Sequence, residues 1–244
     1  MHRSFTRRLQ LSWPTRRLRF AWAAEMVERF SNGTPLRLLD AGCSDGLFAE
    51  RIALRHRDWS IVGVDADPDV LDAGREWLRR ARVENATLRT ADLARPLGRE
   101  EYDAVVALEV LTEVPDDDAA LRSIVLALRP GGLLLVHVPL QGWRPVTRLG
   151  RSEAWPGAVR RGYSSEELRT KLERAGFVRI RIAAGGRSMA RLGTELTERI
   201  DWRPDALRLA WHPFALAMAA CERHGLTWGP PTFLEIEAYR GVTD

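Results

Sequence analysis

Residues 38–46 read Leu-Leu-Asp-Ala-Gly-Cys-Ser-Asp-Gly, and they hold the strongest structural signal in the chain. An apolar run leads into a turn that carries Gly42 and Gly46, and a helical pattern follows over residues 45–55. Glycines let a ligand approach the backbone closely, and the start of a helix offers unpaired N–H groups. Asp40 precedes the turn, where its charge would repel a pyrophosphate and would suit an ammonium or sulfonium group. We therefore expect a strand, a turn and a helix that together bind a small cationic group.

A nicotinamide dinucleotide is the least favoured ligand for this turn. Dinucleotide-binding turns read GxGxxG, and their third glycine lets the helix pack closely on the strand. Leu47 stands at that third position here. Together with the acid at Asp40, this departure argues against a nicotinamide-dependent oxidoreductase.

On both sides of the turn, short apolar segments alternate with helical segments. This alternation predicts βαβ units and a parallel sheet that is covered on both faces. We expect strands over residues 36–40, 61–65, 87–91, 104–108, 133–138, 177–182 and 232–239. We expect helices over residues 18–30, 45–55, 68–81, 116–128, 164–176 and 189–222, the last broken by Pro204 and Pro213. Residues 129–132, Arg-Pro-Gly-Gly, are expected to form a turn.

The domain organisation follows from these segments. We expect residues 1–244 to form a single domain, because this length allows one sizeable core. Its parts would be a helical lead-in over residues 1–33, a ligand-binding core over 34–184, a helical insertion over 185–230, and a last strand and tail over 231–244.

Composition indicates an ordinary globular protein. Hydrophobic residues make up 45% and charged residues 29% of the 244 residues. The formal net charge is +4, and Lys171 is the single lysine, so the positive charge is almost all arginine. The 33 acidic residues are spread along the chain, which favours a mixed surface over a dedicated nucleic-acid-binding face.

The cysteines and the apolar runs bear on the location of the protein. Cys43 and Cys221 are too few for a disulfide framework, and they lack the spacing of a metal site. We therefore expect a reducing, cytoplasmic setting. The N-terminus lacks the apolar segment of a signal peptide, and no apolar run approaches the roughly 20 residues of a membrane span.

The segment at residues 40–46 resembles the first motif of class I S-adenosylmethionine-dependent methyltransferases. That motif usually reads DxGxGxG, and Ser44 replaces its middle glycine here. Four more segments resemble the family's motifs in its order, namely 63–65 (Gly-Val-Asp), 91–93 (Ala-Asp-Leu), 102–111, and 128–132 (Leu-Arg-Pro-Gly-Gly). Residues 162–177 resemble the family's helix before strand six, and the similarity covers residues 34–184 and the last strand. One such motif alone would be weak, whereas five in order are specific.

The resemblance implies a fold and a cofactor. The fold is an α/β, Rossmann-like, seven-stranded and mostly parallel sheet with helices on both faces, and here a helical cap is inserted before the last strand. That last strand would run antiparallel between strands five and six. The cofactor is S-adenosyl-L-methionine, bound outside the carboxyl ends of the first strands. The implied cofactor-binding residues are Asp40, Gly42, Ser44, Gly46, Asp65, Ala66, Asp92, Leu93 and Leu108.

The acidic positions each carry a structural alternative. Asp65 would accept hydrogen bonds from the ribose hydroxyls, but it also fits a helix cap. Asp92 would accept from the adenine amino group, but it also fits a turn. The acidic run at residues 116–118 is expected to cap a helix rather than to bind a metal, and we expect no metal site.

Catalysis and acceptor binding are expected to use groups near the ends of strands four and five. The cofactor carries the reactivity, and a hydroxyl acceptor often needs a general base. The candidate catalytic residues are His137 and Glu113, and the candidate acceptor-binding residues are Glu109 and Tyr163. His137 fits equally well as a core histidine bonded to the backbone. Many relatives have Glu-His where Thr112 and Glu113 stand here, so no histidine can be carried over to that place.

The expected partner is a small-molecule acceptor. Residues 139–163 and 189–222 are additions that would roof its pocket, and the apolar stretch at 207–218 fits a hydrophobic acceptor. The same stretch also fits a cap packed on the sheet or a dimer interface. We expect a monomer or a homodimer that methylates oxygen rather than carbon or nitrogen, in a natural-product, glycan or quinone-like pathway.

Two other functions remain open. An RNA or DNA methyltransferase could use the arginines of residues 3–19, and it would bind nucleic acid in a salt-dependent way. The strand-four segment lacks the Pro-Pro-aromatic and Pro-Cys motifs of such enzymes, so a nucleic acid is the less favoured partner. A non-catalytic cofactor-binding scaffold is compatible with the departures at Ser44 and at residues 112–113.

Overall fold

The computed structural model describes residues 13–147, 157–200 and 205–242. Its strands are β1 (Arg37–Ala41), β2 (Ser60–Asp65), β3 (Ala86–Thr90), β4 (Tyr102–Leu108), β5 (Leu128–Pro139), β6 (Phe177–Gly185) and β7 (Phe233–Arg240). Its helices are α2 (Pro14–Ser31), α3 (Leu47–Arg55), α4 (Pro68–Arg80), α5 (Asp117–Ala127), α6 (Ser165–Ala175), α7 (Ser188–Ile200) and α8 (Asp205–Arg223).

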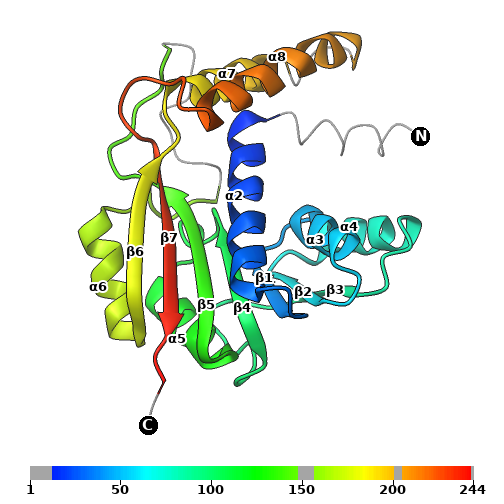
Figure 1. Ribbon diagram of the computed structural model, residues 1–244, viewed down its shortest axis with the longest axis vertical. Coiled ribbons are helices and arrows are strands. Elements are labelled where there is room, and N and C mark those ends of the chain that lie inside the picture. Colours follow the sequence, from blue (N-terminus) through cyan, green and yellow to red (C-terminus); the bar gives the residue numbers. More distant parts are fainter. Residues whose placement is uncertain (1–12, 148–156, 201–204, 243–244) are drawn as a thin grey trace.

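The seven strands form one sheet in the order β3-β2-β1-β4-β5-β7-β6. The neighbours from β3 to β5 pair in parallel, while β7 runs antiparallel between β5 and β6 (Figure 1). The expected Rossmann-like architecture, including the inserted antiparallel last strand, is confirmed. The order of the strands reverses between β1 and β4, which places the switch point beside the glycine turn after β1.

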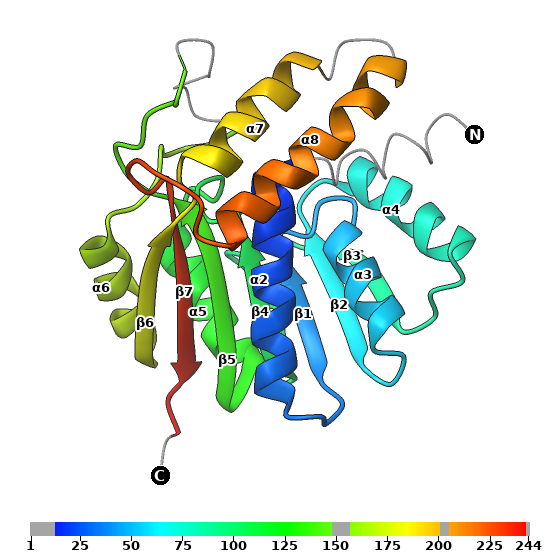
Figure 2. The ribbon, with the colours of Figure 1, turned by 45° about the horizontal axis from the view of Figure 1, so that its top comes forward.

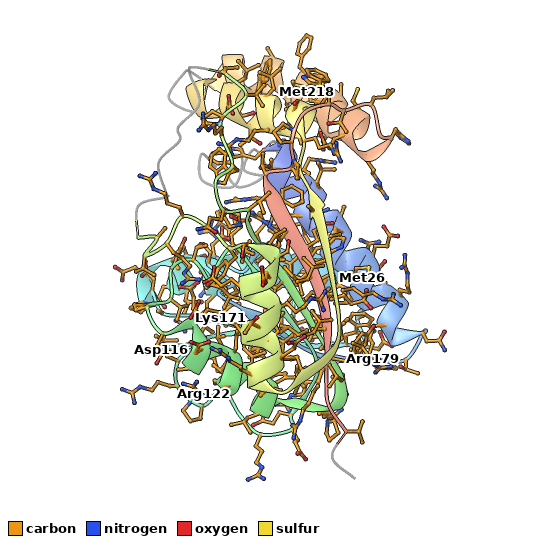
Figure 3. All side chains as sticks on the ribbon, turned by 90° about the vertical axis from the view of Figure 1, so that its left-hand side faces the viewer. Met26, Asp116, Arg122, Lys171, Arg179 and Met218 are labelled. Carbon is orange, nitrogen blue, oxygen red and sulfur yellow. The ribbon has the colours of Figure 1, made fainter. Side chains whose placement is uncertain are left out.

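Helices cover both faces of the sheet. The helices α2, α3 and α4 lie on one face, and α5 and α6 lie on the other (Figure 2). Along β4, Ala104 and Val106 pack into the first layer, and Val105 and Ala107 pack into the second. Both sets are buried, which explains why this strand is apolar throughout instead of alternating. Figure 3 shows the same division, with Met26 of α2 and Arg122 of α5 on opposite sides of the sheet.

The carboxyl ends of the parallel strands are roofed by helices from both ends of the chain. The helices α7 and α8 lie across this edge, and the N-terminal end of α2 reaches it from the side (Figure 1). The hydroxyl oxygens of Thr15 and Thr194 lie 2.9 Å apart and join α2 to α7. The helical insertion is therefore placed over the edge where the ligand site was expected.

Side-chain caps explain where several helices begin. The Asp67 carboxylate accepts the Asp69 amide at 2.9 Å before α4, and the Asp116 carboxylate accepts the Ala119 amide at 2.8 Å before α5. Ser164 caps α6 through the Glu167 amide at 3.1 Å. The acidic run at 116–118 therefore includes a helix cap, and the described residues contain no cluster of potential metal ligands.

Three boundaries differ from the expectations. The helix α2 begins at Pro14 instead of residue 18, because proline fits the first helical position, where its missing N–H is not needed. The expected turn at 129–132 lies inside β5, where it displaces the register against β4. Pro213 lies within α8 and does not end it, although proline removes one helical hydrogen bond. The expected break at Pro204 and the arginines at positions 3, 7 and 8 lie outside the described residues.

Candidate active site

The turn after β1 requires glycine at two positions. Gly42 has φ +75°, and a Cβ atom there would lie 2.3 Å from a methyl carbon of Val110. Gly46 has φ +71°, and its Cβ atom would lie 2.8 Å from Leu88. Residues other than glycine rarely adopt this backbone conformation, and their side chains would also collide with Val110 or Leu88. Ser44, which replaces the family's middle glycine, takes a left-handed conformation as well, with φ 52°.

Asp65 braces this turn from the end of β2. One carboxylate oxygen accepts the Ser44 amide at 2.7 Å, and the other accepts the Asp67 amide at 3.1 Å. The cap of α4 is Asp67, so the alternative that Asp65 caps this helix by its side chain is not what the structure shows. Each carboxylate oxygen accepts more than one hydrogen bond, which leaves capacity for a vicinal diol.

A cavity of about 510 Å³ opens at this edge of the sheet. It is bounded by the glycine turn, the ends of β4 and β5, the start of α2, and α7. An arm of about 180 Å³ continues beneath α2 toward Asp40. The main cavity and its arm share six lining residues, namely Arg16, Arg19, Gly42, Ser44, Val70 and Leu108. The space therefore has a deep end near β1 and a broader end beneath the cap.

The deep arm suits a group that carries both an ammonium and a carboxylate. Asp40 is 3% exposed, and its Oδ2 atom has no hydrogen-bond partner within the described part of the chain. Burial raises the pKa of Asp40 to about 7, helped by the negative charges of Asp65 and Asp45. An ammonium donor would satisfy this oxygen and favour its ionised form. Arg16 and Arg19 line the same arm and would suit a carboxylate, so the residues present fit the amino-acid end of S-adenosylmethionine.

His137, which is buried, and Glu109, which is partly exposed, form a pair that lines the cavity. The Nδ1 atom of His137 lies 2.5 Å from a carboxylate oxygen of Glu109, and the Glu109 amide donates to the His137 carbonyl at 2.8 Å. Glu109 has φ 65°, a left-handed conformation that is unusual for a residue with a side chain. His137 Nε2 is buried without a hydrogen-bond partner among the described residues. The imidazole ring packs on Phe233, with ring centroids 4.3 Å apart.

The charge states of this pair follow from burial and from their contact. Burial lowers the pKa of His137 and outweighs the opposing effect of Glu109. Burial alone would raise the pKa of Glu109, but the hydrogen bond with His137 and the nearby charges, including that of Arg19, lower it overall. Arg19 lies 3.4 Å from the Glu109 carboxylate. The resting pair is therefore a neutral imidazole beside a carboxylate.

The structure separates the other candidates for catalysis and acceptor binding. Glu113 lies at the mouth of the cavity, where desolvation and the charges of Asp65 and Glu109 raise its pKa. Tyr163 is fully buried, and its hydroxyl lies 2.7 Å from Asp117 and 3.0 Å from the Leu111 carbonyl. Tyr163 therefore braces the core beneath the cavity, and its placement gives no support to acceptor binding.

The structure places only some of the residues expected to bind the adenosine part of the cofactor near the cavity. Leu108 lines the cavity and its arm, and Ala66 is exposed next to Asp65. Asp92 is exposed, and its carboxylate accepts the Ala94 amide at 2.9 Å, which is the turn arrangement weighed as its alternative. The side chain of Leu93 is buried in the core. Neither Asp92 nor Leu93 lines the cavity or its arm.

Several lining residues were not expected from the sequence. Arg16 and Arg19 were read only as part of a basic lead-in, although their spacing of three places them on one helix face. Trp143 and Arg191 come from the segments expected to form a roof, with no individual role. The local sequence around these residues does not predict their contacts, because each contact forms between segments that are far apart in the chain.

Comparison with known proteins places the chain in a family. A family described as "Methyltransferase domain" matches residues 15–181. Trans-aconitate 2-methyltransferase of Methylobacterium radiotolerans is 31% identical over 141 residues, which are 56% of this chain and 52% of that protein. Ubiquinone biosynthesis O-methyltransferase of Hydrogenovibrio crunogenus is 30% identical over 109 residues, which are 44% of each. The chain thus spans about half the length of the curated relatives it matches.

A solved structure supports the fold. Phosphoethanolamine N-methyltransferase 2 of Haemonchus contortus, in complex with S-adenosyl-L-methionine, superposes with a TM-score of 0.60 at 17% identity, over 86% of this chain and 49% of that one. Among the described residues, no helix has the length and apolar character needed to cross a membrane. From the family match over most of its length and from its sheet topology, this chain belongs to the S-adenosylmethionine-dependent methyltransferase family.

Proposed function

We propose that this protein transfers a methyl group from S-adenosylmethionine to an oxygen atom of a small-molecule acceptor, with His137 as the general base. The observation that carries the proposal is the Glu109–His137 pair, which lines the cavity and includes an imidazole nitrogen, Nε2, with no hydrogen-bond partner among the described residues. Relatives named for trans-aconitate and for ubiquinone biosynthesis O-methylation support a small acceptor that is methylated at oxygen. A natural-product, glycan or quinone-like pathway remains our prediction for the setting.

Cofactor binding in this proposal uses the turn and its neighbours. Asp40 and the backbone from Gly42 to Gly46 would hold the amino-acid end, and Asp65 would hold the ribose hydroxyls. Ala66, Asp92 and Leu93 lie on the side where we expect the adenine. When bound, S-adenosylmethionine supplies a methyl group on a positively charged sulfur, ready for in-line displacement by the acceptor.

The residues of this chain would remove the acceptor proton. The Glu109 carboxylate accepts a hydrogen bond from Nδ1–H of His137, which assigns the tautomer and would leave Nε2 as the proton acceptor. As the acceptor oxygen attacks, Nε2 takes its proton, and the Glu109 carboxylate stabilises the imidazolium that forms. Glu109 is fixed at two points, through its side chain and its amide, so the ring orientation is set before the acceptor arrives. Glu113 at the cavity mouth is a second candidate to move the proton onward to solvent.

The first test measures the cofactor site apart from the chemistry. Calorimetric titration with S-adenosylhomocysteine should show binding to the wild type, loss of binding in Asp65→Ala, and no binding of NAD. No binding by folded wild-type protein would refute the cofactor assignment.

The second test measures the base. Transfer of a labelled methyl group to the phenol 4-methylcatechol should fall by about 10²- to 10⁴-fold in His137→Gln, with S-adenosylhomocysteine affinity retained. The exposed His224 provides the control variant, His224→Gln, which should keep full activity. Unchanged transfer by His137→Gln would remove His137 from the reaction.

Two further expectations belong to this proposal. We infer a reducing, cytoplasmic setting, because both cysteines are free thiols and Cys43 is buried behind the turn. We also infer a monomer or a homodimer, which sedimentation of the purified protein would distinguish.

A further inference from the structure

The end of the cavity beneath the cap is rich in arginine. Arg160 and Arg161 come from the loop before Tyr163, and Arg191 comes from α7. Two of the four acids that line the cavity, Asp65 and Asp67, lie at the opposite end beside the turn. Arg160 is ion-paired with Asp117 and Glu167, so Arg161 and Arg191 supply the positive charge that favours an acceptor with negative charge at this end.

Arg191 is the most buried of these three arginines. Its guanidinium lies over the Trp143 ring, 4.1 Å from the ring centroid, and its side chain is 12% exposed. Its Nε atom is bonded to Glu195 at 3.2 Å. The stacking on Trp143 and the hydrogen bond that Nε donates to Glu195 fix the plane of the guanidinium, so little side-chain freedom is left to lose when a ligand binds.

The carboxylate of Glu195 does not belong to Arg191 alone. It also accepts the amides of Val146 at 2.9 Å and Thr147 at 3.0 Å, and the Thr147 hydroxyl at 2.7 Å. Its negative charge is thus shared among four donors, while the side chain is 1% exposed. Glu195 therefore positions Arg191 through its Nε atom and shares its own charge with three other donors, and Arg191 is one of the residues that line the cavity.

We infer that Arg191 binds a carboxylate of the acceptor and so selects acceptors that carry both a hydroxyl group and an acid. This inference rests on the proposed function, because it assumes that the acceptor occupies the cavity between His137 and α7. The planar guanidinium matches the two oxygens of a carboxylate, and Arg161 at the rim adds a second positive charge. Arg191 and His137 line the same cavity of about 510 Å³, so one small molecule in it could contact both the anchor and the base.

The experiment compares acids with their neutral esters in the presence of S-adenosylhomocysteine. Caffeate and methyl caffeate form one pair, and citrate and trimethyl citrate form another. By calorimetry, the wild type should bind at least one acid about 10- to 100-fold more tightly than its ester. Arg191→Met should abolish this preference, and Arg191→Lys should keep part of it, because lysine retains the charge but not the fork. Arg122→Met, at an exposed arginine of α5, is the matched control and should leave the preference intact (Figure 3).

Kinetics separate binding of the acid from a merely structural role. In Arg191→Met the KM for caffeate should rise, while kcat and the KM for neutral 4-methylcatechol stay near wild-type values. The inference is overturned if the wild type prefers neither acid over its ester, or if the preference survives Arg191→Met. Methylation of 4-methylcatechol without any acid preference would sink this inference and leave the proposed function standing. Binding of S-adenosylhomocysteine without methylation of either catechol would count against the proposed function itself.

Discussion

Replacement of Gly42 by alanine should destabilise the protein in two ways, through backbone strain and through overpacking. The backbone there has φ +75°, which costs an alanine about 1–2 kcal/mol. The new Cβ atom would also lie 2.3 Å from a side-chain carbon of Val110, and overpacking of this kind costs about 1–3 kcal/mol. Gly42→Ala should therefore lower the free energy of unfolding by about 2–5 kcal/mol.

Gly33 offers a control that isolates the first cost. Its φ of +82° is nearly the same, but a Cβ atom there would meet no heavy atom within 4 Å. Gly33→Ala should lower the free energy of unfolding by only about 1–2 kcal/mol. Urea unfolding followed by tryptophan fluorescence measures both variants by linear extrapolation.

The cofactor site adds a second readout to the same pair. Gly42→Ala should weaken the binding of S-adenosylhomocysteine, because the turn must shift to accept the new methyl group, whereas Gly33→Ala should leave that affinity unchanged. Equal losses of stability in the two variants would refute the claim that contact with Val110 excludes a side chain from this turn.

Three other predictions concern charge and burial. Because an ammonium ligand favours ionised Asp40, whose pKa is raised to about 7, calorimetry should show S-adenosylhomocysteine affinity rising as pH increases toward 7, and Asp40→Asn should flatten this dependence. The effect on stability has the opposite sign. The pKa of Asp40 is near 4 in the unfolded chain and about 7 in the folded protein, so the ligand-free protein loses stability as pH rises from about 4 to 7. Thermal unfolding of Asp40→Asn should lack this pH-dependent contribution. Glu109→Gln should slow methyl transfer by about 10²-fold or more while leaving S-adenosylhomocysteine affinity within a few-fold, and an unchanged rate would show that His137 needs no carboxylate partner. Tyr163→Phe should lower the free energy of unfolding in urea by about 1–3 kcal/mol, because buried Asp117 loses a hydrogen bond. If the rate of methyl transfer fell by more than the fraction of folded protein, Tyr163 would have a role in the site after all.

The features that the sequence predicted correctly are set by local patterns. Apolar strands, glycine turns and acidic helix caps each involve residues within a few positions of one another, so the sheet and most boundaries followed from them. The order of strands came from the resemblance to a family, since no local pattern specifies which strands pair. The turn at 129–132 was misplaced because its Pro-Gly-Gly pattern is also compatible with a local irregularity in a long strand.

The candidate site was predicted unevenly for the same reason. Gly42, Gly46 and Asp65 belong to one βαβ unit, and the structure brings them together. Glu109 and His137 were proposed for separate roles, and their contact depends on the register that sets Leu108 beside His137 across β4 and β5.

Tertiary packing determines which further residues belong to the candidate site, and the sequence alone does not show this. Tyr163 stands in a motif near the site, yet its hydroxyl lies beside Asp117 inside the core. Arg191 and Glu195 carry no motif, and their arrangement appears only when α7 packs over the loop that holds Trp143.

The joining of Thr15 to Thr194 has a consequence for the order in which the site is built during synthesis. The two residues are separated by 179 positions, so the ribosome completes the glycine turn and the strands beside it long before α7 emerges. A nascent chain that has passed β4 already holds the elements that would grip the cofactor, while the acceptor chamber has no roof until the last quarter of the chain arrives. Under the proposed function, acceptor binding therefore requires α7, and a chain that stops before it lacks both the roof and β7, the strand that joins β5 to β6.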